Sequence, residues 1–162
     1  MVPSSSGNPR LAFDEELSET SQKSDLHAYW LSKKGSRLAP PRSAINPAEI
    51  VSLLPIIALL DAIGDPLRFR IRLFGTGLCA AYGQDLTGKF LDEIDLSSIG
   101  ADIVRHAERV VREFRVHIGR SRFTTRNGRH IEYERIALPL SNDGGTVNMI
   151  LVGHVVERAY GP

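Results

Sequence analysis

The sequence predicts an α+β domain in which helices cover one face of a five-stranded antiparallel sheet. Three observations lead to this fold class. Two strand-like stretches, residues 56–63 and 67–74, stand close together and precede a helical region. An amphipathic helix is expected at residues 98–115. Three more strand-like stretches follow it, at residues 116–125, 129–140 and 146–157.

The N-terminal part of the chain divides into a tail and a helical extension. Residues 1–17 have the Ser- and Pro-rich composition of a flexible tail. Residues 18–54 form the extension and its linker, and they begin with a helix whose Leu26, Tyr29 and Trp30 share one face. Such a stripe must be buried, either on the chain's own sheet or against a second copy. We expect these three residues to form a homodimer interface.

A second, shorter helix and a β-hairpin begin the core, which we place at residues 55–158, followed by a short tail at 159–162. Asn46 is a suitable N-cap, Pro47 fits the first turn, and Pro55 ends this helix. The strand at 67–74 then alternates apolar residues with arginines, so one face is expected to be buried. The apolar set is Leu67, Phe69, Ile71 and Leu73.

The rest of the core is marked by turn signals. Thr76 is expected to cap a short helix that Gly83 closes, and another short helix is expected near residues 84–95. Asn127-Gly128 and the segment 142–145 predict turns between the last three strands. The apolar positions of the strand 129–140 shift from odd to even numbers, which predicts a bulge near Glu134 and Arg135.

One short motif suggests a nucleotide site. Gly75, Gly77 and Ala80 match the G-x-G-x-x-A spacing of dinucleotide-binding turns. However, the helix that follows ends at Gly83, and Asp95, at the right distance for a ribose ligand, lies in a helical or turn stretch. We therefore interpret the glycines as a tight turn between strand and helix.

Several words of the sequence resemble the PAS domains, and in particular a PAS-like family of alphaproteobacteria formerly classed as a domain of unknown function. The words are "YW" at Tyr29, "RLAPPRSAINPAEI" from Arg37, "LLP" from Leu53, "FRIRLFGTGL" from Phe69 and "YGQDLTGK" from Tyr82. The resemblance covers about residues 26–156. It implies a PAS fold and a sensory or regulatory protein of bacterial signal transduction that binds a small molecule, a protein partner or both.

A ligand of such a protein would lie between the sheet and the helices. The residues expected to line this space are Leu78, Cys79, Tyr82, Leu86, His106, Val110, Phe114, Phe123 and Tyr133. The same residues could equally form a filled core, because apolar pockets and apolar cores look alike in sequence. In that case the protein would be an interaction adaptor without a ligand.

Catalysis and metal binding find little support in the sequence. It has no nucleophile with an adjacent base and no histidines at metal-ligand spacing, so we predict neither an enzyme nor a metal site. Cys79 is the only cysteine, its surroundings are not those of a flavin-binding cysteine, and burial is its expected role. His106 without a supporting motif is weak support for haem. The cofactor, if there is one, is not identified.

Charge and hydropathy bear on the partners and the location of the chain. Residues 105–135 contain nine Arg and four Glu, a local net charge of +5. Phosphate or nucleic acid could bind there, but the interleaved glutamates and the lack of aromatic stacking residues favour a solvated face with ion pairs. No apolar run is long enough to cross a membrane, and no signal peptide precedes the core, so we expect a cytoplasmic protein.

Overall fold

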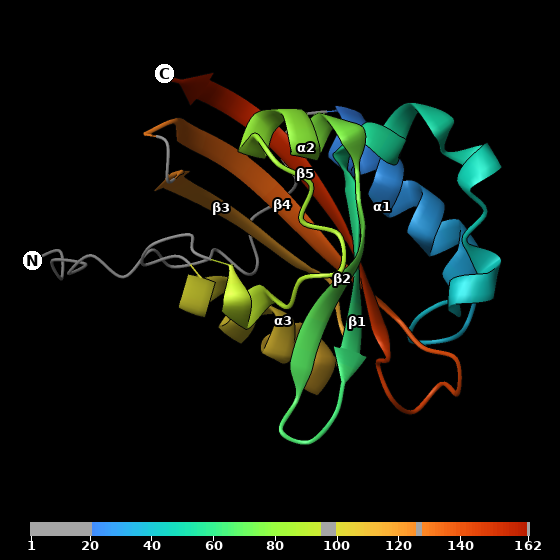
Figure 1. The fold of residues 1–162 in the computed structure, drawn as a ribbon. Coiled ribbons are helices and arrows are strands. Elements are labelled where there is room, and N and C mark those ends of the chain that lie inside the picture. The colour runs from blue at the N-terminus through green and yellow to red at the C-terminus, as the bar shows by residue number, and fades with distance from the viewer. Residues whose placement is uncertain (1–20, 95–99, 126–127, 162) are drawn as a thin grey trace, which may run out of the picture.

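The computed structural model of the chain describes residues 21–94, 100–125 and 128–161. The expected tail at 1–17, the start of the first helix at Ser18, Asp95 and Asn127 of the predicted turn lie outside these residues. Within them a five-stranded sheet is flanked by three α-helices (Figure 1). The helices are α1 (Ser21–Lys34), α2 (Thr76–Tyr82) and α3 (Gly100–Glu113).

The sheet is antiparallel throughout and has the order β2-β1-β5-β4-β3. The last strand of the chain therefore lies at its centre, between the first hairpin and the third and fourth strands. The bounds are β1 (Ile57–Ile63), β2 (Arg68–Phe74), β3 (His117–Thr124), β4 (His130–Leu140) and β5 (Met149–Tyr160). All five predicted strands are confirmed, as are the two-plus-three grouping and the antiparallel pairing.

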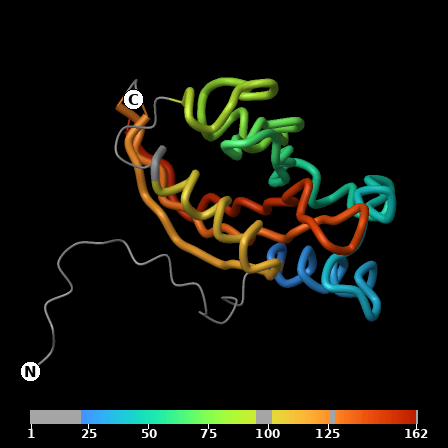
Figure 2. Tube along the Cα trace, turned by 90° about the horizontal axis from the view of Figure 1, so that it is seen from below, coloured from blue at the N-terminus to red at the C-terminus, as the bar shows by residue number. Residues whose placement is uncertain are grey.

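Each face of the sheet carries its own hydrophobic cluster. The first cluster lies under α2, α3 and the 3-10 turn η4 (Leu91–Glu93). The second lies under α1 and the 3-10 turns η1 (Arg42–Ala44), η2 (Pro47–Glu49) and η3 (Val51–Ile56). Figure 2 shows α1 (blue) on one side of the sheet and α2 (green) on the other. The predicted one-sided cover thus consists of α2 and α3, and the N-terminal extension covers the opposite face.

The alternation predicted for residues 67–74 is interrupted near the end of β2. Leu73, expected on the buried face, is 39% exposed, and Phe74 is buried instead. The cause is a bulge: Leu59 pairs with Leu73 and the next residue of β1, Leu60, pairs with Ile71, so one residue of β2 is left over. An extra residue reverses the side to which the following side chains point.

The bulge predicted near Glu134 and Arg135 has a different position and a different cause. The register shift lies between Glu132 and Tyr133, where β4 pairs with β5. The change from odd to even apolar positions arises because β4 is buried on both faces. Tyr133 packs in the cluster under α3 and Ile136 in the cluster under α1.

Local signals fix the ends of the short helices. The side chain of Asn46 accepts a hydrogen bond from the Ala48 amide at 3.1 Å, as an N-cap should. Gly83 closes α2 with a φ of +78°, in agreement with the prediction. Thr76, predicted as the cap of α2, is its first residue, and Gly75 occupies the capping position without a side chain.

Candidate functional site

The glycine-rich turn between β2 and α2 is shaped by close packing. A Cβ atom on Gly75 would lie 2.4 Å from the carbonyl oxygen of Pro55, and one on Gly77 would lie 2.9 Å from it. The Gly75 amide also donates to the Ile57 carbonyl at 2.8 Å. The helix that follows has seven residues and comes after an antiparallel hairpin, which is not a dinucleotide-binding unit. The glycines therefore allow η3 to pack against the turn.

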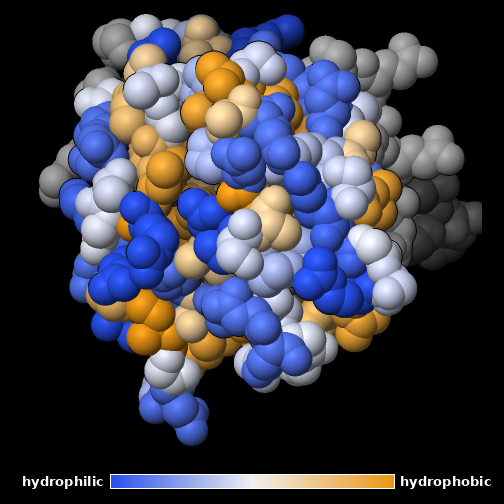
Figure 3. Space-filling view, turned by 90° about the vertical axis from the view of Figure 1, so that its right-hand side faces the viewer, coloured by the Kyte–Doolittle hydropathy of each residue, from blue (hydrophilic) through white to orange (hydrophobic). Residues whose placement is uncertain are grey.

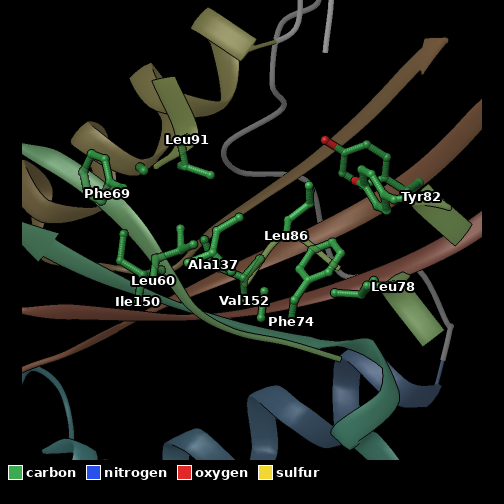
Figure 4. Close-up of a cluster of buried hydrophobic side chains, with 14 of the residues drawn as sticks. Leu60, Phe69, Phe74, Leu78, Tyr82, Leu86, Leu91, Ala137, Ile150 and Val152 are labelled. Atoms are coloured by element: carbon green, nitrogen blue, oxygen red, sulfur yellow. The ribbon is translucent and has the colours of Figure 1, made fainter. Parts of the chain in front are cut away.

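A small cavity lies between the sheet and α3, the position expected for a ligand. Its volume is about 40 Å³, which is room for roughly three water molecules. Leu60, Ile150 and Val152 lie on the sheet and Leu91 of η4 lies across from them (Figure 4). The full lining is Ala58, Leu60, Leu91, Ile103, His106, Ala107, Arg135, Ala137, Ile150, Val152 and His154.

Of the nine residues predicted to line a ligand space, His106 contributes to this cavity. Six others are buried in the hydrophobic cluster on the same face of the sheet: Leu78, Tyr82, Leu86, Val110, Phe123 and Tyr133. Cys79 and Phe114 are partly buried and pack against that cluster. Figure 4 shows Tyr82 near Leu78 and Phe74, at some distance along the sheet from Leu91. Most of the predicted set is thus core, while a contact between these eight residues and a ligand stays a prediction.

Three basic side chains interrupt the apolar lining. Arg135 of β4 is 4% exposed. It lies directly opposite His154 of β5 in the strand register, so the two side chains share a face. His106 of α3 joins them from above the sheet and is 2% exposed. One part of the cavity wall is therefore polar and basic.

The histidines of this wall are held in their neutral form. Burial lowers the pKa of His154 to about 3, and the charge of Arg135 acts in the same direction. Burial also lowers the pKa of His106 far below its usual range, with further contributions from Arg135, His117 and Arg109. At neutral pH the imidazoles carry no charge, so Arg135 is the cation of the cavity.

Two tyrosines border the basic group on the side of α2. The Tyr133 ring packs edge-on against His154 at 4.9 Å between ring centroids, and Tyr82 stacks on His154 at 6.5 Å. Burial raises the pKa of Tyr82 well above its usual value. Arg135 donates to the Tyr133 hydroxyl at 3.4 Å, which is long for a hydrogen bond. Tyr82 thus remains neutral at physiological pH, and both rings pack against His154.

His117 and Glu113 connect the cavity to the surface. The His117 ring contacts His106 edge-on at 5.7 Å between centroids, and its Nε2 lies 3.1 Å from Glu113 Oε2. Hydrogen bonds from Arg109 and Arg115 lower the pKa of Glu113 to about 2, with Arg109 contributing most. The carboxylate is therefore ionised and bonded to groups at the end of α3.

Cys79 has the structural position expected for it. Its Sγ lies 3.6 Å from the Phe74 carbonyl oxygen, and burial raises the pKa of the thiol. A thiol with a raised pKa is a poor nucleophile at neutral pH. This agrees with the packing role predicted from the sequence.

The predicted interface residues of α1 lie against the chain's own sheet. Leu26 and Trp30 are buried in the cluster under α1, and the Trp30 Nε1 donates to the Pro139 carbonyl at 2.9 Å. Tyr29 remains partly exposed, and its hydroxyl donates to Glu49 at 2.7 Å. Leu26 and Trp30 are thus occupied within the chain in this arrangement, and dimerisation stays a prediction.

Among the described residues, four arginines of the segment 105–135 form ion pairs. Arg105 pairs with Asp102. Arg109 and Arg115 both bond Glu113, and the distance from Arg109 Nε to Glu113 Oε1 is 2.8 Å. Arg120 lies 3.2 Å from Glu134 across the β3–β4 ladder. Such pairs leave less positive potential for phosphates, as the interleaved glutamates suggested.

The described residues also bear on whether the chain holds a metal site or a membrane-spanning helix. In the part of the chain that the structure describes, His, Cys, Asp and Glu do not gather in threes as a metal site would need. Over the same residues, none of the helices has both the length and the apolar character to cross a membrane.

The sequence reasoning missed Arg135 and His154 as cavity residues. A signal for Arg135 is present, because this charged residue directly precedes the apolar run from Ile136 to Leu140 in the same strand. It was interpreted as a possible bulge. For His154 nothing in the local sequence distinguishes a cavity residue from a surface one, because its place depends on the register between β4 and β5.

The chain shares similarity with two solved structures and matches one family profile. The chain is similar to a LOV protein of Rhodobacter sphaeroides, with 13% identity over 70% of this chain and 69% of that one, and a TM-score of 0.46. It is also similar to the PAS domain of BvgS from Bordetella pertussis, with 15% identity over 68% and 85% of the two chains, and a TM-score of 0.40. No curated protein matches. The profile of a family described as PAS domain matches residues 18–155, most of the chain. The chain therefore belongs to the PAS domain family.

Proposed function

We propose that this protein is a non-enzymatic sensory or regulatory PAS-domain protein of bacterial signal transduction, acting in the cytoplasm. It binds a small molecule in the cavity under α3 and communicates the bound state to a protein partner. The observation that carries this proposal is the cavity itself, which lies between the sheet and α3 and combines an aliphatic lining with a few convergent polar groups. Concave apolar sites with few polar groups are typical of small-molecule binding.

The position of α3 suggests how a bound molecule would act. His106 and Ala107 of α3 line the cavity, and the helix ends at Glu113, which bonds Arg109 and Arg115 and lies 3.1 Å from His117 Nε2. A ligand that contacts α3 changes the balance between positions of this helix to the extent that it binds one position better. The surface at the end of α3 would then report occupancy.

The proposal is tested by filling the cavity. Ala137→Val adds two methyl groups to a lining residue in the middle of β4, where a β-branched side chain suits the strand. Thermal unfolding is followed for the wild type and the variant in a panel of small metabolites of neutral, cationic and anionic type. We expect some compounds to raise the melting temperature of the wild type and not that of the variant, since binding to the folded state stabilises it.

Ala159→Val is the matched control, because Ala159 is an exposed strand residue of β5 and is not part of the cavity. It should retain the response of the wild type. If no compound stabilises the wild type, or if Ala137→Val responds as the wild type does, the cavity is not a ligand site.

A pure interaction adaptor is the second candidate. It is favoured by three exposed hydrophobic side chains in the described part of the N-terminal extension, Leu31, Leu38 and Val51. Figure 3 shows that hydrophobic areas on this side are separate and interrupted by hydrophilic ones. Scattered exposed apolar residues of this kind are common on monomers, so this candidate has weaker support than the cavity.

A further inference from the structure

We infer that the cavity under α3 is a binding site for a small carboxylate, whose charged end is held by the guanidinium of Arg135. The inference rests on the proposed function and gives its ligand a charge and a chemical class. The carboxylate would face Arg135, His106 and His154, and a short hydrocarbon part would contact the aliphatic lining.

The first observation is that the buried guanidinium of Arg135 forms no ion pair with any residue that the structure describes. Arg135 has five N–H donors. Among the described residues its hydrogen bonding amounts to the 3.4 Å contact with the Tyr133 hydroxyl, and its Nε, which is buried, has no acceptor. Its ring contact is with the same residue, at 5.9 Å to the Tyr133 centroid. A buried charge in this condition is strongly destabilising unless something neutralises it.

The second observation is that the sheet itself directs the nearest carboxylate away. Glu134 precedes Arg135, and because successive side chains of a strand alternate between faces, it points to the α1 side. There it forms ion pairs with Lys23 and Arg120. Opposite Arg135 the partner on β3 is Gly119, which has no side chain, and the partner on β5 is His154.

The third observation is the polarity of the neighbours. His154 and His106 are neutral at physiological pH, and the buried Nδ1 of His154 has no hydrogen-bond partner among the described residues. Neutral imidazole can donate one hydrogen bond to an oxyanion. The cavity thus joins one unneutralised cation to groups able to donate to the same ligand.

The volume and the lining of the cavity favour a carboxylate over inorganic phosphate. A volume of about 40 Å³ holds a group of a few heavy atoms, and the rest of the lining is aliphatic, with Leu60, Leu91 and Ile150 as its large members. A planar carboxylate can accept two parallel hydrogen bonds from a guanidinium. Inorganic phosphate lacks an apolar part for this lining, so a short-chain carboxylate fits better.

The test compares matched charged and neutral probes. Acetate, propionate and butyrate are titrated into the ¹⁵N-labelled full chain at constant ionic strength, beside acetamide, propionamide, butyramide and inorganic phosphate. We expect saturable shifts of the Arg135 Nε–H and of the Ala137 and Val152 amides with the carboxylates, at affinities roughly tenfold or more above those of the amides, since bonds between charged groups are the stronger ones.

The variant Arg135→Met removes the proposed anchor. It should lose the preference for carboxylates, and without ligand its melting temperature should equal or exceed that of the wild type, because an uncompensated buried charge has been replaced by an apolar side chain. Arg112→Met removes the same charge from an exposed position on α3 and should bind as the wild type does.

Each other result overturns the inference. If the amides bind as well as the carboxylates, the proposed small-molecule site stands and its anionic ligand does not. If phosphate binds more tightly than the carboxylates, the ligand class is wrong. A sharp fall in the melting temperature of Arg135→Met would make Arg135 a structural residue. If no probe binds and the metabolite panel also gives no stabilisation, the site and the proposed function fail together.

Discussion

At the scale of single residues, two neighbours on β4 have opposite environments. Glu134 is directed to the α1 side and pairs with Lys23 and Arg120, while Arg135 is directed to the cavity under α3. Their charges are adjacent in sequence but separated by the sheet. The pleat thus keeps apart two groups that would neutralise each other on one face.

The buried histidines predict how stability depends on pH. Because the pKa values of His106 and His154 are lower in the folded chain than their ordinary value of 6.5, the unfolded chain binds more protons below that pH. The free energy of unfolding should therefore be highest above pH 6.5 and fall as the pH decreases toward about 3. Urea denaturation at a series of pH values measures this slope.

His154→Gln should reduce the slope between pH 6.5 and about 3, because one of the two responsible groups is removed. His130→Gln, at an exposed position of β4, serves as the control and should keep the slope of the wild type. An unchanged slope in the His154 variant would show that this imidazole is not protected from protonation in the folded chain.

The tight turn at Gly75 gives a second prediction. Gly75→Ala should lower the free energy of unfolding by about 1–3 kcal/mol, because the new Cβ would meet the Pro55 carbonyl oxygen at 2.4 Å and force the backbone to move. Gly145→Ala is the matched control, since the nearest atom to its Cβ is 3.9 Å away. Equal stabilities of the two variants in chemical denaturation would contradict the close packing at Gly75.

At the scale of elements, the described contacts of α1 with the sheet include a buried ion pair, a hydrophobic stripe and the hydrogen bond from Trp30 to Pro139. Lys23 and Glu134 pair where their side chains are almost wholly buried, and Leu26 and Trp30 follow on the same helix. Gly153 of β5 makes room for this contact, because a Cβ there would lie 2.7 Å from the Leu26 side chain. The docked helix depends on tertiary contacts more than on its own sequence.

Removing one partner of the buried pair should undock α1. Lys23→Met leaves Glu134 buried without its ammonium partner and should cost about 3–5 kcal/mol of unfolding free energy. The double variant Lys23→Met, Glu134→Leu should recover part of this loss. Chemical denaturation of the two variants and of the wild type gives the values.

Lys33→Met on the same helix is the control, because its pair with Glu49 is solvent-accessible and should contribute little to the free energy of unfolding. If Lys23→Met costs no more than Lys33→Met, the buried pair does not hold α1 on the sheet.

At the scale of the whole molecule, the two sides of the sheet are built differently. The α1 side is closed by the helix and by the 3-10 turns, and the α3 side contains the cavity. β5 contributes to both sides and lies between the first hairpin and β4. A structural change in the cavity under α3 would therefore reach α1 through the central strands.

The proposed homodimer can be tested at this scale. With Leu26 and Trp30 buried within the chain, a dimer would have to use other apolar side chains, and the most exposed are Leu38 and Val51. Sedimentation equilibrium should give about twice the chain mass of 17.9 kDa. The double variant Leu38→Ser, Val51→Ser should give the mass of one chain.

The control for this experiment is Leu73→Ser, at an exposed position on β2, which should leave the mass unchanged. A wild type that sediments as a single chain at every accessible concentration would contradict the homodimer predicted from the sequence.

The sequence by itself determined the elements, their order and the family. Period-two and period-3.6 patterns and the caps at Asn46 and Gly83 are local properties, and they were enough to predict five strands, the first hairpin and α3. Together with the resemblance to PAS domains, they led to His106 as a candidate for the space between sheet and helices, and it lines the cavity there. Short-range sterics and amphipathic spacing decide such features, and both can be seen in a single stretch of chain.

Only the tertiary structure decided which face each residue serves and which residues meet. Strand register and cover from distant segments decide three features. They are the bulge that buries Phe74 instead of Leu73, the burial of β4 on both faces and the docking of α1. Arg135 and His154 are 19 positions apart and become neighbours through the β4–β5 ladder. The cavity forms where side chains from segments far apart in the sequence leave space unfilled, so no local pattern of the sequence could have placed it.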